Sequence, residues 1–312
     1  MKQVSFTDFD EFAASVREVD CKMAVQCPVF HNWSLKIAEA GEVEVQFGRL
    51  GTGNVLEGKS WKYGVLVYLP LTPDTRYAAN GETIELDAFM VMEPDCHFDL
   101  SSNGVHDWCT VFVPRVRFHD LAWDQPRSYT TRADPALANR VKSLVSQVLE
   151  ASKNSELFSC SAAARHAESA LIDVTAQVVA LPGKGNDRSR AGRTKHGKLV
   201  RSARKHISST RYDMLRVDEM AEVLGISERA LRYMFQEYFS ASPKKIIEAF
   251  TIRSIRNDLL AADPNERSVT NIVMDHGIYE LGRFAARYRR LYGEQPSETL
   301  RRPASHIASE PS

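Results

Sequence analysis

The sequence predicts an α+β protein in which a β-rich N-terminal domain precedes an all-α C-terminal domain. Three observations support this class. Short apolar runs separated by turn residues fill positions 20–118, apolar residues recur at helical spacing from about position 133 onward, and a helix-turn-helix layout occurs twice in the last hundred residues. The length of 312 residues exceeds that of one typical domain, so we expect two.

Composition is that of a folded, soluble protein, with 43% apolar and 26% charged residues. The N-terminus lacks an apolar run of signal-peptide length, and no stretch approaches the ~18 consecutive apolar residues of a membrane span. The five cysteines include no Cys-x-x-Cys pair, which is typical of reduced thiols rather than of disulfides or a zinc site. We therefore expect a cytoplasmic protein that does not enter a membrane.

Charge is distributed unevenly along this chain, whose formal net charge is zero. Residues 1–182 contain 16 Lys or Arg and 24 Asp or Glu, whereas residues 183–302 contain 24 Lys or Arg and 15 Asp or Glu. The first part is therefore acidic and the second part basic. This asymmetry indicates a polyanionic partner for the second part alone.

Periodicity predicts the elements of the N-terminal part. Apolar residues at helical spacing predict a short helix within residues 5–19. Alternating or dense apolar runs predict strands at 43–47, 63–71, 89–92 and 108–113. Asn80-Gly81 fits a two-residue hairpin turn. Strands at this spacing predict a small β-barrel or sandwich over residues 20–118, and two amphipathic helices follow within 133–181.

Residues 183–198 have no apolar face and are dominated by small residues and positive charges. This composition predicts a flexible linker, either merely solvated or able to contact phosphates. The expected organisation is a domain at 1–182, this linker, a helical domain at 199–302 and a tail at 303–312.

The first helix-turn-helix pattern spans residues 217–238. Gly225 suits the positive-φ position that ends a helix, and Ser227 is placed to cap the next one. The residues expected to face the core of that second helix are Ala230, Leu231, Met234, Phe235 and Tyr238. Its opposite face carries Arg229, Arg232, Tyr233 and Gln236. Such a face suits the major groove of DNA, although a solvated helix in an ordinary bundle would carry similar residues.

The second pattern, at 269–292, repeats this layout after one long helix that begins at Pro243. Gly277-Ile278 corresponds to Gly225-Ile226, with one extra residue before the aromatic core position. Two such units can place two helices in successive major-groove faces, ~34 Å apart. A solvated bundle would not need the duplication, so the repeat favours DNA binding.

The C-terminal layout resembles the AraC/XylS family of bacterial transcription regulators over about residues 200–302. The residues that match the family signature are Phe284, Tyr288, Gly293, Pro296 and Ser297, and Ile278 stands where the family usually has Phe. Residues 281–284 and 298–300 also resemble the subset that includes the ethanolamine-operon regulator. The resemblance implies a transcription regulator, more often an activator, with double-stranded DNA and RNA polymerase as partners.

The resemblance also implies which residues read DNA. In the first unit the family's base-reading positions correspond to Arg229, Arg232 and Tyr233, with Gln236 on the same face. In the second unit they correspond to Leu281, Gly282, Arg283 and Ala286. Arginine can pair with guanine through two hydrogen bonds, and only Arg283 in the second set has a long polar side chain. We therefore expect sequence specificity to be concentrated in the first unit.

The family's N-terminal domain often senses a small molecule through a cupin-like β-barrel and supports a homodimer, so the resemblance implies the same here. The aromatic residues that could line an effector pocket are Trp33, Trp61, Tyr63, Tyr68 and Trp108, with ordinary core packing as the alternative. The histidines His31, His97, His106 and His119 are scattered, so we expect neither a metal site nor a cofactor.

No catalytic motif of the hydrolase, zinc-protease or P-loop kind is present, and the glycines of residues 48–53 indicate a hairpin or bulge rather than a phosphate cradle. We therefore expect a protein that is not an enzyme. The rival interpretation is an enzymatic or small-molecule-binding β-barrel whose helical tail has no role in DNA binding.

Overall fold

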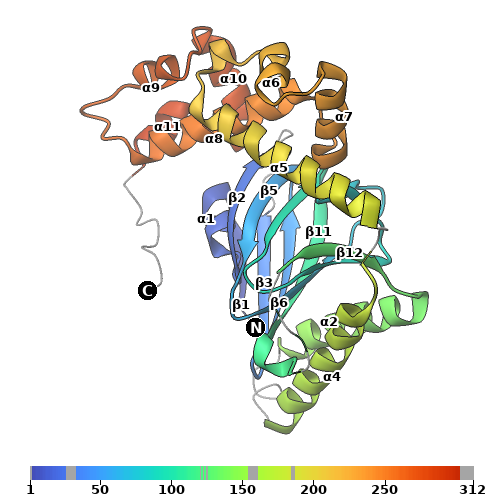
Figure 1. Ribbon diagram of the computed structural model, residues 1–312. Helices are drawn as coiled ribbons and strands as arrows, with labels where there is room; N and C mark the ends of the chain where they lie inside the picture. Colours follow the sequence, from blue (N-terminus) through green and yellow to red (C-terminus); the bar gives the residue numbers. More distant parts are fainter. Residues whose placement is uncertain are drawn as a thin grey trace.

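The structure, a computed structural model, describes residues 2–25, 33–119, 121, 123, 126–153, 161–183 and 187–302, excluding the side chains of residues 161, 187–196 and 208. Two β-sheets lie between a helix pair, α2 (Pro135–Ala151) and α4 (Ser161–Ala180), and a helical C-terminal domain (Figure 1). This arrangement confirms the predicted α+β class with a sheet domain followed by a helical domain. His31 and the predicted tail at 303–312 lie outside the described residues.

The strands form two antiparallel sheets. The seven-stranded sheet has the order β1-β3-β4-β11-β6-β9-β12, and the five-stranded sheet has the order β2-β5-β10-β7-β8. The strands of the first sheet are β1 (Lys2–Phe6), β3 (Trp33–Ala40), β4 (Val43–Leu50), β6 (Gly64–Pro70), β9 (Ala88–Met92), β11 (His106–Pro114) and β12 (Ser128–Arg132). Those of the second are β2 (Val19–Val25), β5 (Asn54–Ser60), β7 (Tyr77–Ala79), β8 (Glu82–Ile84) and β10 (His97–Ser102). Because these described strands form two separate sheets, the closed barrel predicted for 20–118 is not confirmed.

The centre of the seven-stranded sheet is buried on both faces. Along β6, Leu66 and Tyr68 face the five-stranded sheet, whereas Val65, Val67 and Leu69 face α2 and α4. A strand that is covered on both sides has no solvent face, so it reads as a continuous apolar run rather than as an alternation. This explains why 63–71 is so densely apolar.

The first twenty residues differ from the prediction of one helix within 5–19. β1 pairs with β3, opposing Phe6 to Trp33, and α1 (Phe9–Ser15) follows. Asp8, two residues after the end of β1, caps the helix, because its Oδ1 accepts from the backbone N–H groups of Asp10 and Glu11 at 2.8 and 2.9 Å. The helical spacing of Phe9 and Phe12 persists in α1, where both rings are fully buried.

The hairpin predicted at Asn80-Gly81 is present between β7 and β8, with Ala79 paired to Glu82. Both turn residues have positive φ, +50° and +81°, as a type I′ turn requires. A Cβ added to Gly81 would come within 2.5 Å of the Tyr238 ring. The turn glycine is therefore required both by backbone conformation and by close packing against the C-terminal domain.

The predicted linker at 183–198 is largely replaced by α5 (Asp187–Ser209), which runs from the sheets into the C-terminal domain (Figure 1). Its C-terminal half packs through Val200, Ala203 and Ile207. A helix anchored there can extend toward its N-terminus through Arg, Lys and Ala, which are good helix formers and need no apolar face. Polar composition thus did not distinguish a coil from a solvated helix.

The C-terminal domain consists of six further helices. They are α6 (Val217–Val223), α7 (Glu228–Phe239), α8 (Pro243–Ala261), α9 (Val269–Asp275), α10 (Leu281–Tyr292) and α11 (Pro296–Leu300). The long α8 lies between the α6–α7 pair and the α9–α10 pair (Figure 1). No helix in the described ranges is long and apolar enough to cross a bilayer.

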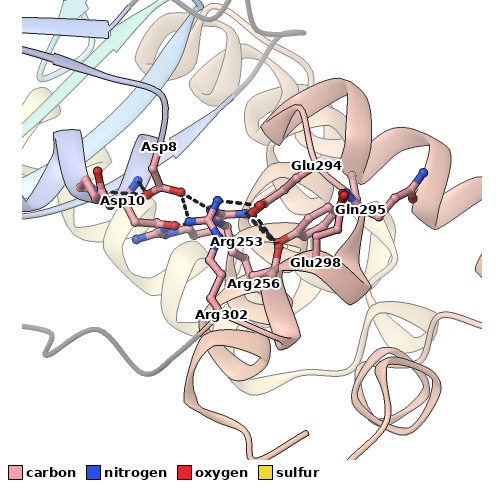
Figure 2. A network of polar contacts seen from close by, with 11 residues as sticks. Asp8, Asp10, Arg253, Arg256, Glu294, Gln295, Glu298 and Arg302 are labelled. Atoms are coloured by element: carbon pink, nitrogen blue, oxygen red, sulfur yellow. Dashed lines mark hydrogen bonds and ion pairs between the residues drawn. The ribbon is translucent and has the colours of Figure 1, made fainter.

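A buried charge cluster joins the start of the chain to α8. Arg256, only 1% exposed, donates from Nη2 to Asp8 Oδ2 at 3.0 Å and from Nη1 to Glu294 Oε1 at 2.7 Å, and its Nε pairs with Asp10. Arg253 pairs with Asp10, and Arg302 pairs with Asp8 and Glu294. Figure 2 shows the two aspartates pointing from the N-terminal domain at these arginines. Three cations therefore balance three carboxylates across the domain boundary.

The hydroxyl of Tyr288 completes the cluster. It accepts from Arg256 Nη1 at 2.8 Å, and its oxygen lies 2.8 Å from Thr299 Oγ1. The Arg256 guanidinium also lies 4.2 Å from the ring centroid of Tyr292, which in turn packs on Phe9 of α1. One apolar core consequently continues from between the sheets into the α8–α10 half of the C-terminal domain.

We predict that Asp8→Ala lowers the free energy of unfolding by about 3–5 kcal/mol, because it leaves the buried cluster with one uncompensated positive charge and removes the α1 cap. Urea denaturation followed by circular dichroism measures this loss. The matched control is Glu39→Ala, which removes an exposed carboxylate 3.0 Å from Arg17 and should cost at most ~1 kcal/mol. Equal, small losses for both variants would contradict the structural role of the cluster.

Candidate nucleic-acid interface

The first helix-turn-helix unit has the predicted geometry. Gly225 ends α6 with φ +66°, and the Ser227 hydroxyl caps α7 by accepting from the Ala230 N–H at 3.2 Å. Leu231, Met234, Phe235 and Tyr238 hold α7 against α5 and α8. Ala230 differs from the prediction, because it is exposed in the first turn of α7 rather than packed in the core.

The outward face of α7 carries the four residues expected to read DNA. Arg229, Arg232, Tyr233 and Gln236 are all exposed, and Tyr233 is 61% exposed. Arg232 pairs with Glu228 one turn earlier at 2.9 Å, a contact that holds the guanidinium close to the helix. A hydrogen bond with Glu237 raises the pKa of Tyr233. The structure thus brings these four side chains together on one open helix face.

The second unit is built in the same way but presents smaller side chains. Gly277 ends α9 with φ +80°, and Phe284, Tyr288 and Leu291 bury the inner face of α10. Gly282 and Ala286 are exposed on its outer face.

The four predicted reading residues of α10 do not share one environment. Arg283 is 82% exposed and pairs with Glu280 at 2.9 Å. Leu281 is partly buried against the core, so it supports the helix rather than facing outward. Gly282 has no heavy atom within 4 Å of the position of an added Cβ, which leaves open space in front of the backbone there. The open face of α10 therefore combines one arginine with two residues small enough for close approach.

A broad, cation-rich hollow runs beside α10 to the start of α8. Among its lining residues are Lys244, Arg283, Arg289 and Arg290, together with the acidic residues Glu248 and Glu280. Arg287 also lines the hollow but pairs with Glu248, and burial lowers the pKa of its guanidinium. Arg289 and Arg290 are exposed at the end of α10 and are better placed than Arg287 for phosphate contact.

Known proteins are similar to this chain in its C-terminal region. A model described as "Helix-turn-helix domain" matches residues 220–302. The XylDLEGF operon transcriptional activator of Pseudomonas putida is 38% identical over 92 residues, 30% of this chain and 29% of that protein. The probable thc operon regulatory protein of Rhodococcus erythropolis is 34% identical over 103 residues, 33% of this chain and 31% of that protein. Residues 220–302 are thus similar to the helix-turn-helix domain of AraC/XylS-type transcription regulators.

The chain thus matches less than a third of the length of these relatives. Among solved structures, the AraC-like transcriptional activator CuxR superposes with a TM-score of 0.43 at 14% identity, covering 87% of this chain and 99% of that one. An AraC-type regulator from Chromobacterium violaceum superposes with a TM-score of 0.31 at 21% identity, covering 36% of this chain and 93% of that one.

The aromatic residues expected at an effector pocket lie in three different places. Tyr68 and Trp108 stack at 6.3 Å and line a cavity between the two sheets. Trp33 is buried in the core against Phe9. Trp61 and Tyr63 lie together near the surface, 37% and 51% exposed, on the turn between β5 and β6.

The histidines are equally dispersed. His97 and His119 are exposed, whereas His106 is buried with Nδ1 3.1 Å from Ser102 Oγ and 2.9 Å from the Gly104 carbonyl oxygen. Burial lowers the pKa of His106, so its ring is neutral at pH 7. In the described part of the chain, no group of three or more His, Cys, Asp or Glu side chains is arranged to hold a metal ion.

Arg256 lies within the matched helix-turn-helix domain but is not among the functional residues predicted from the sequence. The available signal was its position, four residues after Ile252 and three before Leu259, both buried on α8. An arginine at core spacing in an apolar stripe predicts a buried, paired charge. Its partners, 246 and 248 positions away in the sequence, carried no such local signal.

We predict that Gly277→Ala destabilises the protein more than Gly225→Ala. Both need positive φ, which costs an alanine ~1 kcal/mol or more, but Gly225 has free space for a Cβ, whereas Gly277 would bring it within 2.2 Å of Asp213 Oδ1. Thermal unfolding compares the two variants. Adding Asp213→Ala should restore part of the stability lost in the Gly277→Ala variant but none of that lost in the Gly225→Ala variant. An equal gain in stability in both variants would contradict this explanation.

Proposed function

We propose that the protein is a sequence-specific DNA-binding transcription regulator. The observation that carries this proposal is the pair of open helix faces on α7 and α10, displayed by two duplicated units within the residues that match the AraC/XylS-type domain. Each face is held from behind by buried apolar residues and carries arginine outward. Helices presented in this way suit successive major grooves.

The two helix-turn-helix units contribute unequally to the recognition of DNA sequence. On α7, Arg229 and Arg232 can each contact a guanine edge, and Tyr233 can contact a phosphate or a thymine methyl group. On α10, Gly282 and Ala286 allow the backbone to approach DNA closely, but Arg283 is the long polar group of that face. Arg289, Arg290 and Lys244 supply charge for phosphate contacts, which position a protein without reading sequence.

We further propose that the regulator is an activator that contacts RNA polymerase. The relatives that match its C-terminal domain include transcriptional activators by name. The match covers 29% and 26% of the length of two of these proteins, and the proposal of activation rests on that similarity.

Regulation by a small molecule is the corresponding proposal for the N-terminal domain. The cavity between the sheets has a volume of about 40 Å³, enough for a few water molecules, so a larger ligand must displace its walls. Thr110 Oγ1 lines it, buried and without a hydrogen-bond partner in the described residues. Ser101, also in the lining, donates to the Tyr238 carbonyl oxygen of α7 at 2.8 Å. A ligand that moves this wall would therefore act on the first reading unit, provided that it binds two states unequally.

We predict that the full chain binds DNA from upstream of its own gene, and that Arg229→Ala costs ~1–3 kcal/mol of discrimination at individual base pairs. Arg283→Ala should lower affinity with less change in base preference. Fluorescence anisotropy on single-base operator variants, at two salt concentrations, separates the two effects. Arg140→Ala, an exposed arginine on α2, is the matched control. Absence of sequence-dependent binding by the unmodified chain would favour the rival, a small-molecule-binding β protein with an inert helical tail.

We predict that Gly282→Ala separates folding from DNA binding. In the free protein it should raise stability by ~0.5–1 kcal/mol, since the added methyl group meets no atom and the helix gains a better former. If the α10 backbone lies against DNA, the same methyl group lowers operator affinity. Thermal unfolding and anisotropy on one preparation measure both quantities, and unchanged or tighter binding would contradict the close approach of α10.

A further inference from the structure

A groove of about 460 Å³ lies at the boundary between the two domains and shares no lining residue with α7 or α10. Its floor is the outer face of the five-stranded sheet, formed by β2, β5 and β10, and its wall is α5. The volume is within the ~300–1,000 Å³ of small-molecule sites, unlike that of the cavity between the sheets. Both domains therefore contribute to one space large enough for a metabolite.

Strand register arranges charges on the floor in two rows. Lys59 of β5 pairs in register with Asp20 of β2 and with His97 of β10. In the next row, Glu57 pairs with Lys22 and with Asp99. Side chains two residues apart on a strand share a face, so all six belong to the outer surface that α5 covers.

Arg204 of α5 pairs with both acids of the second row. It is 4% exposed, and its Nη1 pairs with Glu57 and with Asp99 Oδ1, the latter at 2.7 Å. Burial nevertheless raises the pKa of Asp99, against the opposing effect of Arg204. Nε and Nη2 of Arg204 are buried with no hydrogen-bond partner in the described residues. This edge of a guanidinium is the one that binds a carboxylate or phosphate with two hydrogen bonds.

Three further cations of the groove have no ion pair within the described residues. Arg201 and Lys205 are exposed on α5, four positions apart and hence on one helix face, and Lys22 is exposed on β2. Asp20 is the acid nearest to Lys22 along β2. The lining as a whole contains five Lys or Arg and three Asp or Glu, and one of the five, Lys59, pairs with Asp95 outside the lining at 2.6 Å.

We propose that this groove binds a small anion bearing a phosphate or carboxylate group, held between Arg201 and Lys205 of α5 and Lys22 of β2. Because the cations come from both domains, the bound anion ties α5, the first helix of the DNA-binding part, to the five-stranded sheet. Its effect on DNA affinity rests on the proposed function, whereas its binding does not.

The test uses the full chain with pyrophosphate and with succinate as probes, at constant ionic strength maintained with sodium chloride. Isothermal titration calorimetry should show binding of one probe, and the thermal midpoint should rise with its concentration. Preference for pyrophosphate assigns a phosphate ligand, and preference for succinate assigns a carboxylate.

Variants locate the site. The double variant Arg201→Ala/Lys205→Ala, and separately Lys22→Ala, should weaken the preferred probe about tenfold or more, in line with the loss of a charge-assisted hydrogen bond. Lys198→Ala removes an exposed charge from the same helix outside the groove and should leave binding unchanged. No saturable binding of either probe, or equal losses in all three variants, would overturn the proposal.

Operator affinity measured with and without the preferred probe then tests the regulatory consequence. A change in affinity that Lys22→Ala abolishes supports coupling through the groove, since Lys22 lies in the N-terminal domain. Probe binding in a chain that fails to bind DNA would leave the anion site standing and contradict only the proposed function.

Discussion

The cluster around Arg256 is the interaction on which the arrangement of the two domains depends. A guanidinium taken out of water is costly unless carboxylates surround it, and two of the three carboxylates here come from residues 8 and 10, at the other end of the chain. The α8 helix can keep this arginine buried only while the first helix of the N-terminal domain stays docked. The position of α8 in turn sets where both reading units stand, because it lies between them.

The domain boundary is therefore polar at two points and apolar between them. Arg256 binds aspartates beside α1, and Arg204 binds Glu57 and Asp99 at the outer sheet. Both arginines also lie against aromatic rings, Tyr292 and Phe239 respectively. Displacing either arginine from its carboxylates would leave a buried charge without a partner, and the cost in free energy opposes a change in the orientation of the domains. A ligand bound at this boundary would therefore act on two domains whose relative orientation these charge pairs already stabilise.

Local patterns predicted a large part of this structure. The helix-turn-helix units, their turn glycines and the Asn80-Gly81 hairpin follow from short-range geometry that neighbouring residues determine. Sheet closure and the Arg256 cluster could not be predicted, because they depend on residues far apart in sequence. The effector residues show the limit most clearly. Aromatic character alone does not distinguish Tyr68, which points between the sheets, from Tyr63, which lies at a turn. Likewise, the polar stretch before residue 199 gave no sign that α5 would continue through it.

Gly81 links a surface hairpin to the end of a reading helix. The ring of Tyr238 occupies the space where any larger residue at position 81 would place its Cβ. Among relatives that keep a large ring at the position of Tyr238, this turn should tolerate neither substitution nor insertion as loops usually do. The two positions should instead change together over evolution, so that substitutions in a β-turn of the N-terminal domain depend on substitutions in a helix of the C-terminal domain.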